Sequence, residues 1–380
     1  MTAGPFTFHR TELALNFIDN LRGNGLFDAS SGMFLAAPRR TGKSTFLRED
    51  LVPEMQKQGF ITVYVDLWSD QSKDPAVLIA DALKNTLAAL NHPTQKFIQA
   101  VGLKKLNIAS VLQFELNQMG QSTGATLADA FAFLSEKTDK PMALIVDEAQ
   151  HALNSQMGIT AMFAIKAARD RLKNKLFLIF TGSHRDKLAH LVLKKDQPFF
   201  GAQITSFPLL GKTFTDAYTD WVNSRLAMHS QFSQEDIFQA FEWVGHRPEI
   251  LKTLIQNIAL DYGSAPNLGL FLREKASELR DQIWSDIENE YASLTSLQKV
   301  VFEVMIAKGR EFSPFTEDSM VVYRKLLNRN DFGAPQIQAA LDALRERNLV
   351  WNSARGAYAL EDASLIQWFS QRRNANSEPV

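Results

Sequence analysis

Residues 33–44 read MFLAAPRRTGKS, a short apolar run that leads into a glycine, a lysine and a serine. The apolar run has the composition of a buried strand, and the residues after Gly42 open an amphipathic helical stretch. Gly42 lets backbone amides turn inward onto an anion, and the helix N-terminus adds a partial positive charge. Lys43 supplies a full positive charge at the same place. The stretch therefore predicts a phosphate-binding loop between a strand and a helix.

The loop has the Walker A pattern, with an alanine where the first glycine commonly stands. The pattern predicts that Lys43 reaches the β and γ phosphates of a nucleotide and that Ser44 ligates Mg²⁺. The residues expected to contact the nucleotide are Ala37, Pro38, Arg39, Arg40, Thr41, Gly42, Lys43, Ser44 and Thr45. The alternative is a chance match, which average residue usage produces in roughly a few per cent of chains of this length.

A second apolar run, residues 142–146, ends in Asp147 and Glu148, which is the Walker B arrangement. Asp147 is predicted to hold Mg²⁺ through its water shell, and Glu148 to polarise the attacking water. The alternative is that the two carboxylates only cap a helix. Their pairing with the loop at residues 37–44 in one α/β domain favours the nucleotide site.

A third apolar run, residues 176–180, ends in Thr181, Gly182 and Ser183. In a parallel sheet this end faces the same edge as Asp147. Thr181 or Ser183 is therefore a candidate to contact the γ-phosphate or the water, and we take Ser183 as a catalytic candidate beside Lys43 and Glu148. A plain polar strand terminus is the alternative.

The order of elements predicts an α/β P-loop NTPase fold, followed by an α-helical lid and a winged-helix domain. Apolar runs alternate with helical stretches in the first half, as in a parallel sheet covered by helices. From Lys212 helical periodicity takes over, and residues 291–372 read as helix, helix, a helix started by Pro335, and a hairpin around 353–356. The predicted domains are residues 1–211, 212–288 and 289–372, with a polar tail at 373–380.

The composition limits the possible functions. The 380 residues include no cysteine, which excludes disulfides, thiolate metal sites and cysteine nucleophiles. The N-terminus lacks the features of a secretory signal, and every apolar run is too short to cross a bilayer, so we expect a cytoplasmic protein without a membrane partner. The net charge of −1 provides no general attraction to nucleic acid.

Taken together, these motifs resemble the AAA+ superfamily, and more narrowly its STAND-type and archaeal-type ATPases. Residues 8–13 (FHRTEL) look like the N-terminal segment that lies near the adenine in such proteins, which implies a nucleotide contact for Arg10. Residues 176–183 resemble the sensor 1 strand, residues 245–248 (GHRP) the Gly-x-x-Pro turn of the lid, and residues 358–362 the end of the winged helix. The resemblance implies ATP and Mg²⁺ as cofactors, ATP hydrolysis or ATP-gated switching, and an approach of Pro248 to the nucleotide.

The sequence departs from this family at Ala202, where relatives often carry an arginine after the sensor 1 strand. An arginine that meets the γ-phosphate charge in the transition state changes the rate by several orders of magnitude. We therefore expect slow turnover without a partner. Arg185 or Arg247 either replaces this arginine or lies on the surface. His184 and His246 are expected to be structural, because this chemistry needs no imidazole base.

The helix that begins near Pro335 has an apolar inner stripe. Outside that stripe lie residue types that read base edges in a major groove, namely Gln336, Gln338, Arg345 and Arg347. Residues 292–380 nevertheless hold 11 Lys and Arg against 10 Asp and Glu, a net charge of +1, which supplies little phosphate attraction. The domain either contacts DNA, packs within the molecule or binds protein.

We expect an ATP-binding, slowly hydrolysing AAA+ or STAND-type switch, whose nucleotide state controls the lid, the winged helix and partner binding. The alternative is a DNA-binding ATPase that resembles origin-recognition proteins and acts in replication, mobile-element or repair processes. The partners are then ATP or ADP, with DNA, a protein or a second copy as further candidates. A scaffold that only binds nucleotide is disfavoured, because it has no need of Glu148.

Overall fold

The computed structural model describes residues 5–25, 29, 31–91, 127–193, 195–263, 265–354, 356–361 and 364–375. The chain forms two compact units. The first, here called the sheet unit, comprises the described residues of 9–37 and 43–207. The second, the helical unit, comprises those of 1–8, 38–42 and 208–380. The domain bounds at residues 211, 288 and 372 stay predictions.

The sheet unit is built on a five-stranded parallel sheet of order β2-β3-β4-β1-β5. The strands are β1 (Met33–Ala36), β2 (Ile61–Asp66), β3 (Met142–Asp147), β4 (Leu176–Gly182) and β5 (Ile204–Ser206). This confirms the predicted parallel sheet. The sequence pattern does not predict β5, because this strand has only three residues and two of them are exposed.

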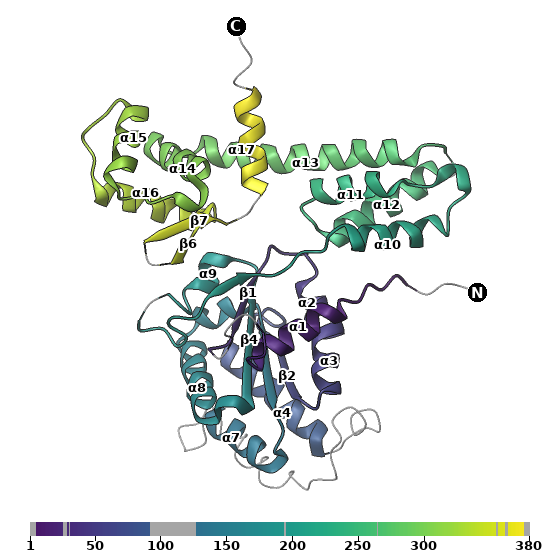
Figure 1. Ribbon diagram of the computed structural model, residues 1–380, viewed down its shortest axis with the longest axis vertical. Coiled ribbons are helices and arrows are strands. Elements are labelled where there is room, and N and C mark those ends of the chain that lie inside the picture. The colour runs from purple at the N-terminus through teal and green to yellow at the C-terminus, as the bar shows by residue number, and fades with distance from the viewer. Residues whose placement is uncertain are drawn as a thin grey trace. The chain divides into compact units, whose positions relative to one another are not determined.

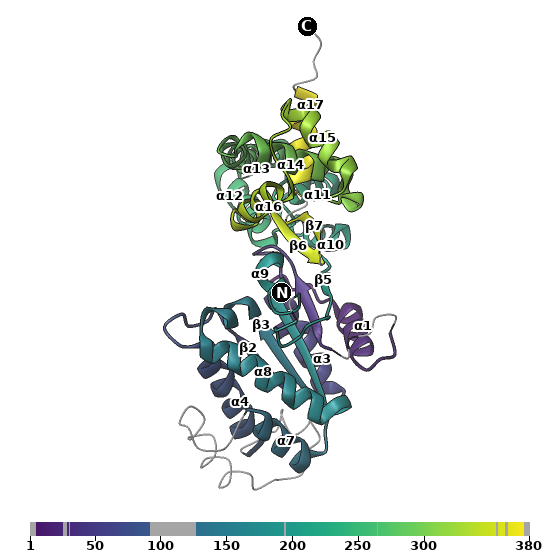
Figure 2. The same ribbon diagram turned by 90° about the vertical axis from the view of Figure 1, so that its left-hand side faces the viewer.

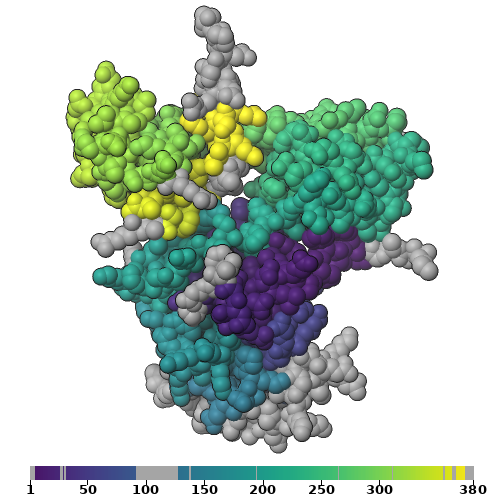
Figure 3. Space-filling model, viewed as in Figure 1, coloured from purple at the N-terminus to yellow at the C-terminus, as the bar shows by residue number. Residues whose placement is uncertain are grey.

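Helices cover both faces of the sheet (Figures 1 and 2). One face packs against α4 (Pro75–Asn91), α7 (Leu127–Thr138), η2 (Ala149–Asn154), α8 (Gln156–Leu172) and α9 (Arg185–Ala189). The other packs against α1 (Thr11–Leu21), α2 (Lys43–Phe46), the π-helical turn η1 (Leu47–Leu51) and α3 (Val52–Lys57). The outer face of α1 contributes to the purple surface in Figure 3.

Burial on both faces explains the continuous apolar runs in the strands. In β3, Leu144 and Val146 pack in the core on the α8 side, whereas Ala143 and Ile145 pack in the core on the α1 side. All six residues of β3 are buried. Such a strand has no solvent face and therefore no alternation of polar and apolar residues.

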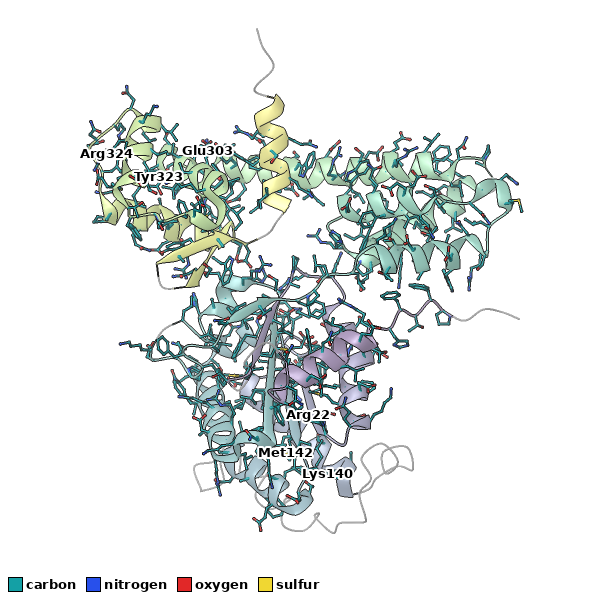
Figure 4. All side chains as sticks on the ribbon, viewed as in Figure 1. Arg22, Lys140, Met142, Glu303, Tyr323 and Arg324 are labelled. Atoms are coloured by element: carbon teal, nitrogen blue, oxygen red, sulfur yellow. The ribbon has the colours of Figure 1, made fainter. Side chains whose placement is uncertain are left out.

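Parallel pairing brings the carboxyl ends of all five strands to one edge. Ala36 of β1 pairs with Gly182 of β4, and Asp66 of β2 pairs with Asp147 of β3. Met142, where β3 begins, and Lys140 mark the opposite edge (Figure 4). The loop after β1, which the sequence predicts to bind phosphate, and the acidic residues at the end of β3 thus leave the sheet at the same edge.

The helical unit opens with α10 (Lys212–Asn223), α11 (Gln234–Trp243), α12 (Pro248–Tyr262) and the long α13 (Leu268–Ala292). The apolar residues at helical spacing along α11 and its C-cap are buried, with Ile237, Ala240, Phe241 and Val244 all 0% exposed. Gly245 and His246 both have positive φ and reverse the chain between α11 and α12. Pro248 begins α12, where its missing N–H costs no hydrogen bond.

The rest of the unit has a core of its own, formed by four helices and a hairpin. The elements are α14 (Ser296–Lys308), α15 (Glu317–Leu327), α16 (Ala334–Glu346), β6 (Val350–Ala354), β7 (Ala357–Leu360) and α17 (Ser364–Ala375). The described residues also include short helices, η3 (Lys173–Lys175) in the sheet unit and η4 (Met228–Ser230) and η5 (Gly309–Glu311) in the helical unit. On α15, Tyr323 is buried in this core whereas the neighbouring Arg324 lies on the outside (Figure 4). Among the described residues, no helix combines the length and apolar character needed to cross a membrane.

Candidate nucleotide-binding site

The loop between β1 and α2 has the backbone that the sequence pattern requires. Gly42 has φ of +88° and Arg40 has φ of +66°, so the loop takes two left-handed turns. The hydroxyl of the buried Thr41 donates to the carbonyl of Pro38 at 2.8 Å and closes the turn. On the strand side, the amide of Ala37 donates to the carbonyl of Gly182 at 3.2 Å and ties the loop entrance to β4.

Lys43 lies buried between the two acidic residues of the Walker B strand. It begins α2 and is 5% exposed. Its ammonium nitrogen is 3.1 Å from Glu148 Oε1 and 3.8 Å from Asp147 Oδ1. The fold therefore brings one buried cation and two carboxylates together at the edge of the sheet, from positions 105 residues apart in the chain.

Asp147 is fully buried and is held by donors from two neighbouring strands. Thr181 of β4 donates a short hydrogen bond to Oδ1, and the amide of Glu148 donates to the same oxygen at 3.1 Å. The hydroxyl of Tyr64 on β2 donates to Oδ2 at 3.2 Å. Burial and the charge of Asp147 raise the pKa of Tyr64 well above its usual range, so the phenol keeps its proton and remains a donor.

Glu148 combines an unusual backbone with a fully engaged carboxylate. Its φ of 54° and ψ of 42° are left-handed, a conformation that costs energy for a residue other than glycine. Besides Lys43, its carboxylate accepts hydrogen bonds at Oε2 from Gln150 Nε2 at 2.5 Å, Ser183 Oγ at 2.7 Å and the Ser183 amide at 3.3 Å. Glu148 makes no side-chain capping bond to η2, so the capping alternative is wrong for this residue.

The charge of Glu148 is stabilised by these partners. Burial alone raises the pKa of this carboxyl, but Lys43 and the hydrogen bonds from Ser183, Gln150 and Lys43 outweigh it and lower the pKa to about 2. Asp66, on the neighbouring strand, shows the opposite balance, because burial and the charges of Asp147 and Glu148 raise its pKa. Glu148 is therefore a carboxylate at neutral pH.

Two residues at this site have no motif that predicts them. Gln150 follows Glu148 by two positions and is 4% exposed, but an isolated glutamine after an acidic pair carries no chemical signal in the sequence. Tyr64 reaches Asp147 only because β2 pairs with β3 in the observed register. Strand order and register, which the sequence pattern does not contain, decide the Tyr64 contact, whereas the contact of Gln150 with Glu148 is local in the chain and depends on the backbone turn at Glu148.

The remaining candidates within the sheet unit are spread more widely. Ser44 follows Lys43 and is half-buried, whereas Thr45 is exposed. The guanidinium of Arg10 lies over the rings of Phe46 and Phe207, at 5.7 and 5.2 Å from their centroids. Burial lowers the pKa of Arg10.

Further candidates lie in the helical unit. Arg39 and Arg40 are exposed, and Arg40 lines a groove of about 490 Å³ with residues of α12 and α13. Arg247 and Pro248 lie at the start of α12. His246 Nδ1 is 2.9 Å from the carbonyl oxygen of Leu210, a contact that gives this ring a structural role.

The turn after the sensor-like strand carries no cation. Gly201 has φ of +91°, and the amide of Ala202 donates to the carbonyl of Phe199 at 3.0 Å. Arg185 instead donates to Ser206 Oγ at 3.0 Å, at the end of β5. Arg185 is therefore held at the sheet edge that carries the acidic residues.

The donor set fits a nucleotide with a magnesium ion. Asp147 and Ser44 offer carboxylate and hydroxyl oxygens, the hard ligands that Mg²⁺ prefers. Lys43, at the N-terminus of a helix and next to a loop with inward-turning backbone, suits phosphate. No described group of three or more His, Cys, Asp or Glu forms a metal site built from protein side chains alone.

A parallel sheet with a loop of the Walker A pattern after β1, an acidic strand end at β3, and β4 between them is the P-loop NTPase fold. Among solved structures, the chain is similar to the Walker-type ATPase PABY2304 of Pyrococcus abyssi, with 19% identity over 96% of each chain and a TM-score of 0.57. It is also similar to the ORC2 protein of Aeropyrum pernix in its ADP form, with 13% identity, 96% of this chain and 93% of that chain covered, and a TM-score of 0.51. At such identities the likeness concerns the fold. No protein-family model and no curated protein sequence matches the chain.

Proposed function

We propose that this chain is an AAA+-type ATPase that binds ATP with Mg²⁺ and hydrolyses it slowly. The observation that carries the proposal is the placement of buried Lys43, which directly follows the loop, against buried Asp147 and partly buried Glu148. A buried cation between two carboxylates is costly to maintain for structure alone, since apolar side chains of similar size are often as stable. A phosphate-binding role gives the cluster a use.

Each residue of the cluster has a distinct task in this proposal. Lys43 exchanges its carboxylate partners for phosphate oxygens, and Glu148, ionised at neutral pH, accepts a hydrogen bond from the attacking water. Ser44 and Asp147 hold the magnesium ion, which when bound neutralises charge on the phosphates. Ser183 keeps the carboxylate of Glu148 oriented. We expect slow turnover because position 202 holds an alanine and not an arginine that could meet the γ-phosphate charge in the transition state.

The test is hydrolysis by the Glu148→Gln variant. The amide keeps the shape of the side chain but is a poor acceptor of a proton, and general-base contributions are about 10²–10⁴-fold in rate. We expect ATP affinity to be retained while steady-state turnover falls at least about 100-fold. Parental turnover in a folded Glu148→Gln variant, or undetectable turnover in the wild-type protein, would refute the assignment.

Between the STAND-type switch and the origin-recognition alternative, structural likeness supports the second. One of the two similar structures reported above is an ORC2 protein, and neither of the two is named as a STAND protein. We read α14, α15, α16 and the β6–β7 hairpin as a winged helix on the order of these elements. An origin-recognition ATPase would contact duplex DNA through this winged helix in a nucleotide-dependent way. A switch that binds protein would not.

The contacts of α16 weigh against base reading by this helix. Gln336 accepts the amide of Gly333, and Gln338 contacts Asp342 and Tyr358. Arg345 pairs with Asp342 at 3.2 Å, and Arg347 pairs with Glu290 at 2.7 Å. All four side chains that the sequence offers for base edges are thus engaged within the molecule.

A further inference from the structure

Gln150 contacts Glu148 more closely than any other described donor does. Its Nε2 lies 2.5 Å from Glu148 Oε2 and 3.4 Å from Ser183 Oγ. Only the amide nitrogen can donate to a carboxylate, so the contact fixes which way the amide faces. Gln150 is only 4% exposed, so the residues packed around it leave its side chain little freedom to move away.

Gly182 makes room for this glutamine. A Cβ atom placed on Gly182 would lie 2.6 Å from Gln150 Oε1 and 3.4 Å from Leu188 Cβ. Gly182 does not have a positive φ, so its backbone conformation accepts an L-amino acid. A Cβ atom at the end of β4 would thus displace the Gln150 amide, whereas the backbone conformation of Gly182 itself sets no demand for glycine.

We propose that Gln150 is the positioning residue for Glu148, seated on Gly182 and acting together with Ser183. This inference rests on the proposed ATPase function and goes beyond it by naming the residues that aim the water-polarising carboxylate. Oε2 accepts all three donors from Gln150 and Ser183, whereas Oε1 has Lys43 as its described partner. Oε2 is therefore an anchor, and Oε1 is the oxygen left to meet a water once Lys43 turns to phosphate.

The left-handed backbone of Glu148 makes this anchor necessary. A residue at φ of 54° points its side chain differently from one in a strand or helix, and it stays there only when surrounding contacts hold it. Gln150 and Ser183 approach from η2 and from the end of β4, so two elements fix one carboxylate. Removing one anchor leaves the charge in place but lets its direction vary, and small errors in direction are costly for a catalytic group.

The test compares Gln150→Met with wild-type protein in steady-state ATP hydrolysis. Methionine has a similar length and is apolar, so it fills the site without donating a hydrogen bond. We expect kcat to fall about 10- to 100-fold, the usual cost of losing a supporting partner, with KM within about twofold because Gln150 has no described contact with Lys43 or the loop. Gln56→Met is the matched control, since Gln56 donates to Thr62 outside the site at 2.9 Å and should leave both constants unchanged.

A second pair of variants separates positioning from general damage to the strand. Gly182→Ala should lower kcat by a factor similar to that of Gln150→Met, because the added methyl group displaces the amide. In a Gln150→Ala background the same Gly182→Ala change should lower kcat by less than about twofold, because the displaced side chain is gone. Thermal unfolding of every variant shows whether it is folded.

The possible outcomes are distinct. Retained kcat in Gln150→Met, raised kcat, a change confined to KM, or a full further loss from Gly182→Ala in the Gln150→Ala background would each overturn the positioning role. If wild-type protein hydrolyses ATP and Glu148→Gln does not, while Gln150→Met keeps its kcat, only this inference fails. If wild-type protein does not hydrolyse ATP, the proposed function fails and the inference fails with it.

Discussion

Lys43 shows how strongly one side chain shapes this site. Its ammonium is the described cation closest to Asp147 and Glu148, and it is almost completely buried. Its loss would leave buried Asp147 and partly buried Glu148 without their counter-charge, and removal of one partner of a buried ion pair is strongly destabilising. Binding and stability should therefore both respond to changes at this position.

We predict that Lys43→Ala weakens ATP binding at least about tenfold, because the main cation for the β and γ phosphates is gone. Titration of the protein with a fluorescent ATP analogue measures this directly. Lys57→Ala is the control, since that lysine is 68% exposed and pairs only with Glu54 among the described residues. Equal affinity in folded Lys43→Ala protein would mean that the loop does not bind the phosphates.

The hydrogen bond from Thr181 to Asp147 can be tested by changing one side chain. Thr181→Val keeps the shape but removes the hydroxyl that donates to the charged Asp147, and loss of one hydrogen bond to a charged group costs about 1.5–3 kcal/mol. We expect the free energy of unfolding, measured with denaturant, to fall by that amount. Thr181→Ser keeps the donor and should lose less. A more stable valine variant would show that Asp147 does not depend on this bond.

Among the elements, the helices of the helical unit depend on their buried stripes. Phe241 of α11 is fully buried and contacts the rings of Phe214 and His246, at centroid distances of 5.2 and 5.1 Å. The sequence periodicity identifies this stripe because one turn of a helix is local in sequence. The ring partners come from α10 and from the turn before α12.

We predict that Phe241→Ala lowers the free energy of unfolding by about 3–5 kcal/mol, as expected for loss of a buried aromatic side chain. Phe238→Ala on the same helix is the comparison, because Phe238 is only partly buried and contacts Lys212. Its cost should be clearly smaller. Similar losses for the two variants would contradict the burial pattern of α11.

The behaviour of the whole molecule toward DNA depends on charge. The net charge is −1, and the two arginines of the α16 region, Arg345 and Arg347, are paired with carboxylates. Duplex affinity comes mainly from neutralising phosphates with free cations. A molecule with this charge balance has little driving force for non-specific binding.

We therefore predict weak duplex binding at physiological salt, with Kd no tighter than about 10⁻⁶ M, and a shallow dependence of log affinity on log salt. Fluorescence anisotropy with labelled duplex at two salt concentrations, with and without ATP, measures both quantities. The double variant Arg345→Ala and Arg347→Ala should change the affinity little. Nanomolar, sequence-selective binding would instead establish the origin-recognition alternative.

The sequence by itself determined the parallel α/β sheet, the loop at residues 37–44, the acidic strand end and the buried stripes of α11 and α16. These features are local, because a strand, a helical stripe or a glycine turn is specified by residues that are neighbours in the chain. The sequence does not predict strand β5, since three residues that are at least partly exposed show no periodicity.

Only the tertiary structure decided which side chains meet. Tyr64 and Asp147 are 83 residues apart, Ser183 and Glu148 are 35 apart, and Arg347 and Glu290 are 57 apart. The first two contacts exist because β3 lies between β2 and β4 in the sheet. The third removes a cation that the sequence offered to DNA. Strand order and helix packing follow from the joint burial of many apolar residues, so no single stretch of sequence contains them.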